Sequence, residues 1–289
     1  MTGLRLTVLA HRHHPCIIGW GLFNELYQDP MPDGTAEPVV RELNALVHGL
    51  DPDRPTLAAT DKADKLELNA ISDALGINIY PGWYWGWAKH LGYHWEVQVA
   101  KNARTTCAVS EFGAGGCIDQ HRNPAGERPD WKGRFHPEEY QTKFHHDAWA
   151  SLGGKPQLWG AFVWQMFDTR SPTRKEGSRD GVNDKGLVTR DRKTRKDAYY
   201  FYKANWNPEP MLYLAGARMT ATTNAQHEVV GFCNLPDEVT LSVNGRVVSS
   251  QKPDAVKQVL WSGVALEPGK NVIRLTVGGL VSEQSVLRH

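Results

Sequence analysis

The chain has 289 residues, and its 33 Lys and Arg balance 32 Asp and Glu, which leaves a formal net charge of +1. This length is enough for two domains with a substantial core. The near-neutral charge argues against a function that depends on bulk attraction to nucleic acid or to a membrane surface. No apolar run approaches the ~20 residues of a membrane-spanning helix. The apolar stretch at residues 6–10 is too short for a signal-peptide core, so with Met1 as the natural start a cytoplasmic location is favoured.

The first two-thirds of the chain alternates short apolar runs with stretches of helical spacing. Strands are predicted at residues 16–20, 56–59, 74–80, 106–110 and 158–164. Helices are predicted at residues 38–50, 85–100, 137–152 and 196–206. Strands that alternate with helices indicate βα units and a parallel sheet. Residues 168–182 are rich in Arg, Ser, Gly and Pro and are predicted to form a long loop.

A different pattern begins after Asn207-Pro208-Glu209-Pro210, where the prolines predict a domain boundary. Short strands are predicted at residues 229–233, 239–243, 246–249, 256–261 and 271–277. Asn244-Gly245 is a strong hairpin turn signal between two of them. Closely spaced short strands are typical of a small antiparallel sandwich. The predicted domains are therefore residues 1–206 and 207–289.

Two carboxylates end apolar runs in the first domain. Glu25 follows the run at residues 17–24, and Glu111 follows the run at residues 107–110. Parallel barrels build their active sites at the carboxyl ends of their strands. Two carboxylates on two strands of one barrel are the catalytic equipment of a glycosidase. Each acid taken alone is equally well explained as a loop residue that happens to follow a strand.

The composition is unusual in its eleven tryptophans, ten of which lie at or before Trp206. A large core uses some indoles, and a sugar-binding cleft uses others as stacking surfaces. Two of the four cysteines, Cys16 and Cys107, fall inside predicted strands, and no Cys-x-x-Cys or His-Glu-x-x-His spacing occurs. The sequence therefore predicts no metal site and no disulfide framework.

Five sequence blocks, in order along the chain, resemble glycoside hydrolase family 2, which holds β-galactosidases, β-glucuronidases and β-mannosidases. The blocks are Arg12-His13-His14-Pro15-Cys16 through Asn24-Glu25, Asn78-Ile79-Tyr80-Pro81-Gly82-Trp83-Tyr84, Ser110-Glu111-Phe112-Gly113-Ala114, residues 160–168 and residues 183–193. The chain departs from the family pattern at His13, where Asn is usual, and at Cys16, where Ser is usual. The resemblance implies a partial (β/α)8 barrel that contains strands four to eight, followed by an immunoglobulin-like domain.

The same resemblance implies roles for individual residues. Glu25 would be the general acid and then the general base, and Glu111 would be the nucleophile of a retaining exo-β-glycosidase. Asn24 would bond the sugar 2-hydroxyl, with a structural Asn at a strand end as the alternative. Tyr80 would donate its hydroxyl to Glu111, with a core tyrosine as the alternative.

Four further residues are assigned to substrate binding. Trp164 would form the floor of the sugar subsite or fill the barrel interior, and Trp83 would either line the cleft or pack in the core. Asn183 and Lys185 match an Asn-x-Lys pair that grips the uronate carboxylate in β-glucuronidases. The same run also resembles many β-galactosidases, so the pair leaves the sugar open.

The sequence therefore predicts a β-galactosidase first and a β-glucuronidase second, acting on a β-linked galactoside or related glycan without a cofactor. A catalytically weak or inactive barrel fragment with a carbohydrate-binding role is the alternative from a different class. Five strands leave two open sheet edges, which invite another chain. A homo-oligomer that covers these edges is therefore expected, with no nucleic-acid or membrane partner.

Overall fold

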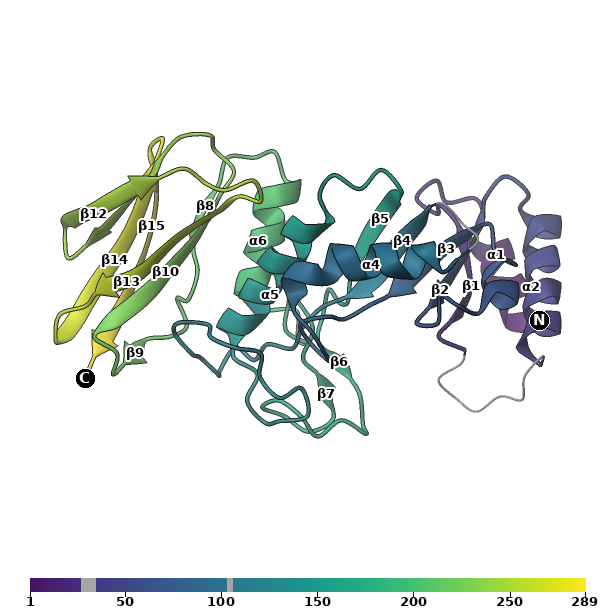
Figure 1. Ribbon diagram of the computed structural model, residues 1–289, viewed down its shortest axis with the longest axis horizontal. Coiled ribbons are helices and arrows are strands. Elements are labelled where there is room, and N and C mark those ends of the chain that lie inside the picture. Colours follow the sequence, from purple (N-terminus) through teal and green to yellow (C-terminus); the bar gives the residue numbers. More distant parts are fainter. Residues whose placement is uncertain (27–34, 103–105) are drawn as a thin grey trace. The chain divides into compact units, whose positions relative to one another are not determined.

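The computed structural model describes residues 1–26, 35–102 and 106–289. Within these residues the protein has a five-stranded parallel sheet, a three-stranded antiparallel sheet, a five-stranded mixed sheet and a two-stranded antiparallel sheet (Figure 1). The predicted α/β class with a parallel sheet is thus confirmed. One compact unit comprises Met1–Pro81, His90–Phe112 and Gly153–Val163. The other comprises Gly82–Lys89, Gly113–Leu152 and Trp164–His289.

The first unit is built on the parallel sheet, whose strand order follows the chain. The strands are β1 (Trp20–Asn24), β2 (Thr56–Thr60), β3 (Ala74–Asn78), β4 (Cys107–Phe112) and β5 (Leu158–Val163). The central strands are apolar and buried, with Leu75 and Ile77 of β3 at 0% and 1% exposure, as expected when both faces of a sheet are covered. Because all five strands run in the same direction, their carboxyl ends lie along one edge of the sheet.

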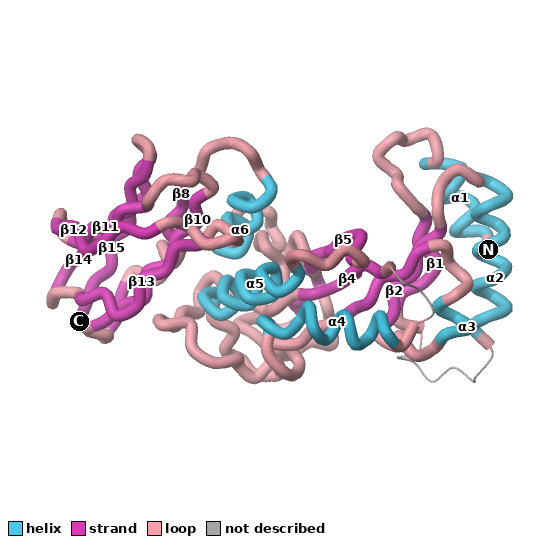
Figure 2. The backbone as a smooth tube through the Cα atoms, turned by 45° about the horizontal axis from the view of Figure 1, so that its top comes forward, coloured by secondary structure: helices cyan, strands magenta, loops and turns pink. Residues whose placement is uncertain are grey.

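The helices of the first unit pack on this sheet and on one another. They are α1 (Thr2–His11), α2 (Ala36–Leu50), α3 (Leu66–Asn69) and α4 (Leu91–Ala100). Both ribbon and tube views show α4 running along the sheet (Figure 2), and the indole of Trp95 donates a hydrogen bond to the Ala108 carbonyl of β4. The sequence did not predict α1. Its amphipathic pattern is weak because only Val8 is buried on it, against Trp20 and Val47.

The predicted strand at residues 16–20 is wrong, because β1 begins only at Trp20. The preceding residues form a turn in which the Ile17 amide donates to the His14 carbonyl. The Arg54 guanidinium then donates to the carbonyls of both turn residues, at 2.7 Å to Ile17 and 3.2 Å to His14. These carbonyls are therefore bonded to a side chain instead of a neighbouring strand. Cys16 consequently lies outside the sheet and is exposed, unlike Cys107 of β4.

The second unit contains two helices, a small hairpin, and two further sheets that share one apolar core. Its helices are α5 (Glu138–Leu152) and α6 (Asp197–Trp206), and a short helix η1 spans Ala88–His90 across the unit limit. The hairpin is β6 (Thr169–Arg170) with β7 (Val182–Asn183), and all but its last residue falls in the predicted loop at residues 168–182. The remaining strands are β8 (Leu212–Leu214), β9 (Ala221–Thr222), β10 (Gln226–Cys233), β11 (Val239–Val243), β12 (Arg246–Gln251), β13 (Gln258–Ala265), β14 (Gly269–Val277) and β15 (Leu280–Arg288). The three-stranded sheet is antiparallel, and the five-stranded sheet is mixed because β15 pairs with β9 in parallel.

The strands predicted for the C-terminal region correspond to β10 through β14, and β11 has the predicted bounds. β15 was missed because its middle residues, 282–285, are all polar and only Val286 of the strand is buried. The division of the chain at residues 206 and 207 stays a prediction. Among the described residues, no helix combines the length and the apolar character needed to cross a membrane.

Candidate active site

The first candidate acid lies directly after the end of β1. Asn24 is the last residue of the strand, and the backbone amide of Glu25 donates a 3.0 Å hydrogen bond to the Ala59 carbonyl of β2. Glu25 has a φ of 50°, in the left-handed region that residues other than glycine seldom adopt. Backbone strain of this kind is concentrated at functional sites. The left-handed backbone conformation of Glu25 is therefore consistent with a functional residue.

Asn78, the last residue of β3, connects this strand end to the rest of the site. Its side-chain amide donates to Glu25 Oε1 at 2.8 Å and to Asn24 Oδ1 at 2.9 Å. Its amide oxygen accepts a 2.6 Å hydrogen bond from the Ser110 hydroxyl of β4. With its donor and acceptor groups all engaged, the Asn78 side chain has one orientation, and that orientation fixes where the Glu25 carboxylate is held.

The second candidate acid lies within β4, where Glu111 pairs with Asn78 in the sheet register. The Tyr80 hydroxyl donates a 2.7 Å hydrogen bond to Glu111 Oε2, and the Ile79 amide donates to the Glu111 carbonyl. Close approach of β3 to β4 requires Gly76, because a Cβ there would lie 2.4 Å from Ser110 Cβ. A side chain at position 76 would therefore push Ser110 away from Asn78.

These contacts bring together four residues that the sequence analysis selected: Asn24, Glu25, Tyr80 and Glu111. The contact expected between Tyr80 and Glu111 is present. Two carboxylates held by neutral hydrogen-bond donors at one sheet edge are chemically suited to proton transfer and to nucleophilic attack. The functional roles of these residues remain predictions.

Sequence reasoning gave no role to Asn78 or Ser110. A signal for Asn78 was present, because it lies two residues before Tyr80, and alternate residues of a strand project to the same side. The spacing therefore predicts that both side chains reach the same site. The role of Ser110 depends on the register between β3 and β4, which the sequence does not reveal.

The other selected residues lie in the second unit. Lys185 is 1% exposed, and its Nζ lies 5.3 Å from the ring centroid of Trp83 and 5.2 Å from that of Tyr84. Burial lowers the pKa of the Lys185 ammonium. Among the described residues, no carboxylate forms an ion pair with this ammonium. The Lys185 side chain is thus buried beside two aromatic rings and forms a hydrogen bond with Tyr84.

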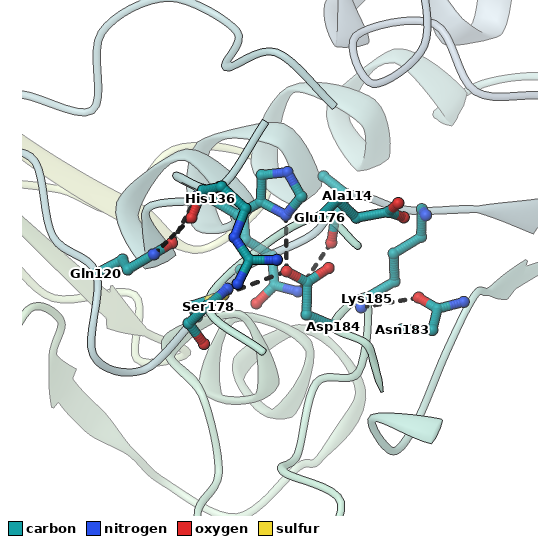
Figure 3. A network of polar contacts seen from close by, with 12 residues as sticks. Ala114, Gln120, His136, Glu176, Ser178, Asn183, Asp184 and Lys185 are labelled. Atoms are coloured by element: carbon teal, nitrogen blue, oxygen red, sulfur yellow. Dashed lines mark hydrogen bonds and ion pairs between the residues drawn. The ribbon is translucent and has the colours of Figure 1, made fainter. Parts of the chain in front are cut away.

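The neighbours of Lys185 in the chain hold its backbone in place. Its amide donates a 3.2 Å hydrogen bond to the Asn183 side-chain oxygen, and Asn183 is itself 5% exposed (Figure 3). Trp83 is fully buried, which favours the packing role that the sequence left open, whereas Trp164 is 38% exposed. The Gln165 amide, which follows Trp164, donates to the Lys185 carbonyl. Trp83, Asn183 and Lys185 thus form one group within the second unit.

The chain is similar to parts of several larger proteins of known name. No protein-family model matches the sequence. A β-glucuronidase from Bacteroides fragilis is 43% identical over 273 residues, which are 94% of this chain and 38% of that protein. A putative β-glucuronidase from Formosa agariphila is 28% identical over 269 residues, which cover 32% of its length. The chain therefore spans between about a third and two fifths of the curated relatives it matches.

Solved structures with similar names also match this chain. The FMN-binding β-glucuronidase from Faecalibacterium prausnitzii L2-6 superposes with a TM-score of 0.89 at 31% identity, over 99% of this chain and 43% of that one. A putative β-galactosidase from Bacteroides fragilis gives the same TM-score at 29% identity and the same coverage. These similar proteins thus carry both β-glucuronidase and β-galactosidase names.

Proposed function

We propose that this chain carries the catalytic carboxylates of a retaining β-glycosidase of glycoside hydrolase family 2, and that its substrate is a β-glucuronide. The observation that carries the proposal is the pairing at the end of β3, where Asn78 donates to Glu25 and Tyr80 donates to Glu111. The similarity to proteins named β-glucuronidase and β-galactosidase supports the same reaction class.

In the proposed reaction, Glu111 attacks the anomeric carbon while Glu25 gives its proton to the departing glycosidic oxygen. The C–O bond to the leaving group breaks as the bond to the Glu111 carboxylate forms. Glu25, now ionised, removes a proton from water, whose oxygen displaces Glu111 from the anomeric carbon. Glu25 ends protonated, Glu111 ends ionised, and the sugar keeps its β configuration.

The neighbours of the two acids are proposed as positioning residues. The Tyr80 hydroxyl orients the attacking Glu111 carboxylate through its 2.7 Å hydrogen bond. Asn78 holds Glu25 and Asn24 by the same amide group, and Asn24 would then present its own amide to the sugar 2-hydroxyl. Hydrogen bonds to this hydroxyl strengthen in the transition state of glycoside hydrolysis.

The preference for a glucuronide rests on Lys185. Asn183 and Lys185 match the Asn-x-Lys pair that, by the family resemblance, binds an anionic group of the sugar, and the relative at 43% identity is named β-glucuronidase. A uronate carboxylate would supply that anionic group, whereas a galactose hydroxymethyl group would not. This reverses the order expected from the sequence, in which the galactoside came first. A β-galactoside is retained as the second candidate substrate because one similar structure is named a putative β-galactosidase.

The five parallel strands are proposed to be part of a (β/α)8 barrel, and the two C-terminal sheets, formed by β8 to β15, are proposed to form an immunoglobulin-like domain. β1 and β5 are the outer strands of the parallel sheet. On β5, Trp159 and Phe162 are 41% and 47% exposed. Outer strands with exposed apolar side chains favour pairing with another chain, so a homo-oligomer that covers them is proposed.

A panel of nitrophenyl β-glycosides with the purified chain tests the function. The expected result is turnover with the highest kcat/KM for the β-glucuronide. A higher kcat/KM for the β-galactoside would overturn the sugar assignment and leave the reaction class standing. No turnover of any β-glycoside by a folded chain would contradict the proposal and favour the inactive fragment with a carbohydrate-binding role.

A further inference from the structure

We propose that Cys117, His136 and Asp184 form a binding site for one thiophilic divalent cation, with Zn²⁺ as the best match. One thiol, one imidazole and one carboxylate are the ligand types that zinc combines in proteins. The three residues lie in the second unit and are 5%, 0% and 7% exposed. The donor atoms of the cluster all lie within 4.8 Å of one another.

The spacing of the donor atoms is close to what a tetrahedral ion requires. Asp184 Oδ2 lies 2.7 Å from His136 Nδ1 and 3.2 Å from Cys117 Sγ (Figure 3). Ligands at ordinary zinc bond lengths stand roughly 3.4–3.6 Å apart. For these two pairs, the separations would have to lengthen by about 0.4–0.7 Å to accept the ion. The backbone amide of Ser178 already donates a 3.3 Å hydrogen bond to the Cys117 sulfur.

Two glycines leave the space around these atoms open. A Cβ at Gly115 would lie 2.5 Å from Asp184 Oδ1 and 2.9 Å from His136 Nδ1. A Cβ at Gly177, which has a φ of 67°, would lie 2.3 Å from Asp184 Oδ2 and 3.3 Å from the Cys117 sulfur. Any other residue at either position would occupy the volume beside the donor atoms. The backbone at Gly115 and Gly177 thus lies close to the three donor atoms and leaves no room there for a side chain.

The cluster also has an entry route. Cys117 and Asp184 line a cavity of about 520 Å³ whose wall includes Asp119, Asp168 and Asp180. Arg179 and Arg190 also line this cavity. Water in the cavity would complete a four-coordinate ion with three protein ligands. Lys196 lies nearby but is engaged, because its Nζ donates to Asp168 Oδ1 and to the Gly116 and Asp184 carbonyls.

Without an ion the same atoms form a hydrogen-bonded network. Burial and the neighbouring Asp184 charge raise the pKa of the Cys117 thiol to about 12, so the thiol keeps its proton and donates to Asp184. His136 Nδ1–H donates to the same oxygen. Metal binding would displace the thiol proton to solvent, because the thiolate is the form of cysteine that ligates a metal ion. The site was not visible in the sequence, because its ligands are separated by 18 and 47 residues.

Cobalt substitution of the purified chain, kept reduced, tests the proposal. Co²⁺ should saturate at one equivalent and give the near-ultraviolet thiolate-to-cobalt charge-transfer band with intense visible bands of a four-coordinate ion. Zn²⁺ should displace it and remove both. Absence of the charge-transfer band at one equivalent would overturn the proposal, and so would its survival in Cys117→Ser.

Matched variants distinguish loss of the metal ligand from general effects of substitution on the protein. Cys117→Ser retains a hydroxyl that can donate to Asp184, so it should fold as the parent does while losing the band and at least about tenfold in cobalt affinity. Cys16→Ser changes an exposed cysteine and should keep both. If His136→Gln proves unfolded, the spectrum of the parent protein and that of Cys117→Ser still decide the question. Equal loss of the band in Cys16→Ser would contradict the assignment.

Discussion

The hydroxyl of Tyr80 donates a 2.7 Å hydrogen bond to Oε2 of Glu111, across the register between β3 and β4. Two residues earlier on the same strand end, Asn78 donates to Glu25. One strand end thus holds both carboxylates, each through a different side chain. The orientation of both carboxylates therefore depends on the geometry of the β3 end.

Removal of Asn78 is expected to impair catalysis with little effect on substrate affinity. In Asn78→Ala the Glu25 carboxylate loses the donor that orients it, and misplacement by about 1 Å costs roughly 100-fold in rate. We therefore expect kcat to fall about 10- to 100-fold at nearly constant KM. Leu75→Ala is the matched control, because Leu75 is buried on the same strand. It should lower thermal stability and leave kcat unchanged in the folded protein, and an equal loss of kcat in both variants would contradict the positioning role.

Replacement of Glu111 tests the nucleophile directly. Glu111→Gln should abolish turnover, because an amide cannot form the glycosyl ester. In Glu111→Gly, azide should occupy the vacated space and attack the anomeric carbon once, giving a glycosyl azide of inverted configuration. Product configuration read by proton NMR decides between the mechanisms. Full activity in either variant, or a rescued product of retained configuration, would remove Glu111 from this role.

Lys185 is expected to set the preference for a uronate. Loss of a hydrogen bond to a charged group costs about 1.5–3 kcal/mol, so Lys185→Ala should lower kcat/KM for the β-glucuronide about 10- to 100-fold. The value for the β-galactoside should change little. Lys175→Ala removes an exposed lysine of the same unit and should alter neither. A parallel loss on both sugars in Lys185→Ala would indicate a structural role for this residue.

His146 is expected to make the free energy of unfolding depend on pH. Its side chain, on α5, contacts Asp254 in the β12–β13 connection. Burial opposes protonation of His146, but hydrogen bonds to Asp147 and Asp254 outweigh it and raise its pKa from 6.5 to about 9. Because the folded-state pKa is the higher one, this stabilisation is fully present below pH 6.5 and is lost as the pH rises through about 9. His146→Gln should therefore lower the unfolding free energy by roughly 1–2 kcal/mol at the acid end of this window.

Urea unfolding of parent and variant across that window checks this prediction. The difference between them should shrink as the pH rises. Lys143→Met serves as a control, because Lys143 pairs with the same Asp147 from an exposed position, and surface pairs contribute little. A difference for His146→Gln that is constant with pH would contradict the assignment.

Exposed apolar residues on β5 are expected to mediate self-association. Light scattering of the purified chain should give a mass above that of the monomer, and Phe162→Glu should reduce it, because a charge on an outer strand opposes pairing. Val247→Glu, at a residue that is 70% exposed on β12, should leave the mass unchanged. A monodisperse monomer with cooperative unfolding would contradict the oligomer.

Much of this organisation could be predicted from the chain. The alternation of apolar runs and helices predicted the parallel sheet, since buried parallel strands such as β3 and β4 are nearly continuous apolar segments. The position of β1 was misjudged because the bonds from Arg54 to the turn at residues 14–17 are long-range contacts. β15 was missed because strands with one exposed face carry a weak apolar signal.

In the candidate site, too, some features could be predicted from the sequence and others depend on long-range contacts. Glu25 and Glu111 were recognisable because each ends an apolar run within a family-like block. The function of Asn78 as a bridge depends on which residues of β1, β3 and β4 lie beside one another, and register is a tertiary property. The environment of Lys185 likewise depends on packing against Trp83 and Tyr84, which are a hundred residues away in the chain.

The central claim is that Glu111 forms a covalent bond to the sugar, and mass spectrometry after reaction with a 2-deoxy-2-fluoro-β-glucuronyl fluoride tests it most directly. The fluorine slows hydrolysis of the glycosyl ester more than its formation, so the intermediate should accumulate. The account predicts one added 2-deoxy-2-fluoroglucuronyl group per chain, located on the peptide that contains Glu111 and absent in Glu111→Gln. A folded chain that gains no adduct, or that carries it on another residue, would contradict the account.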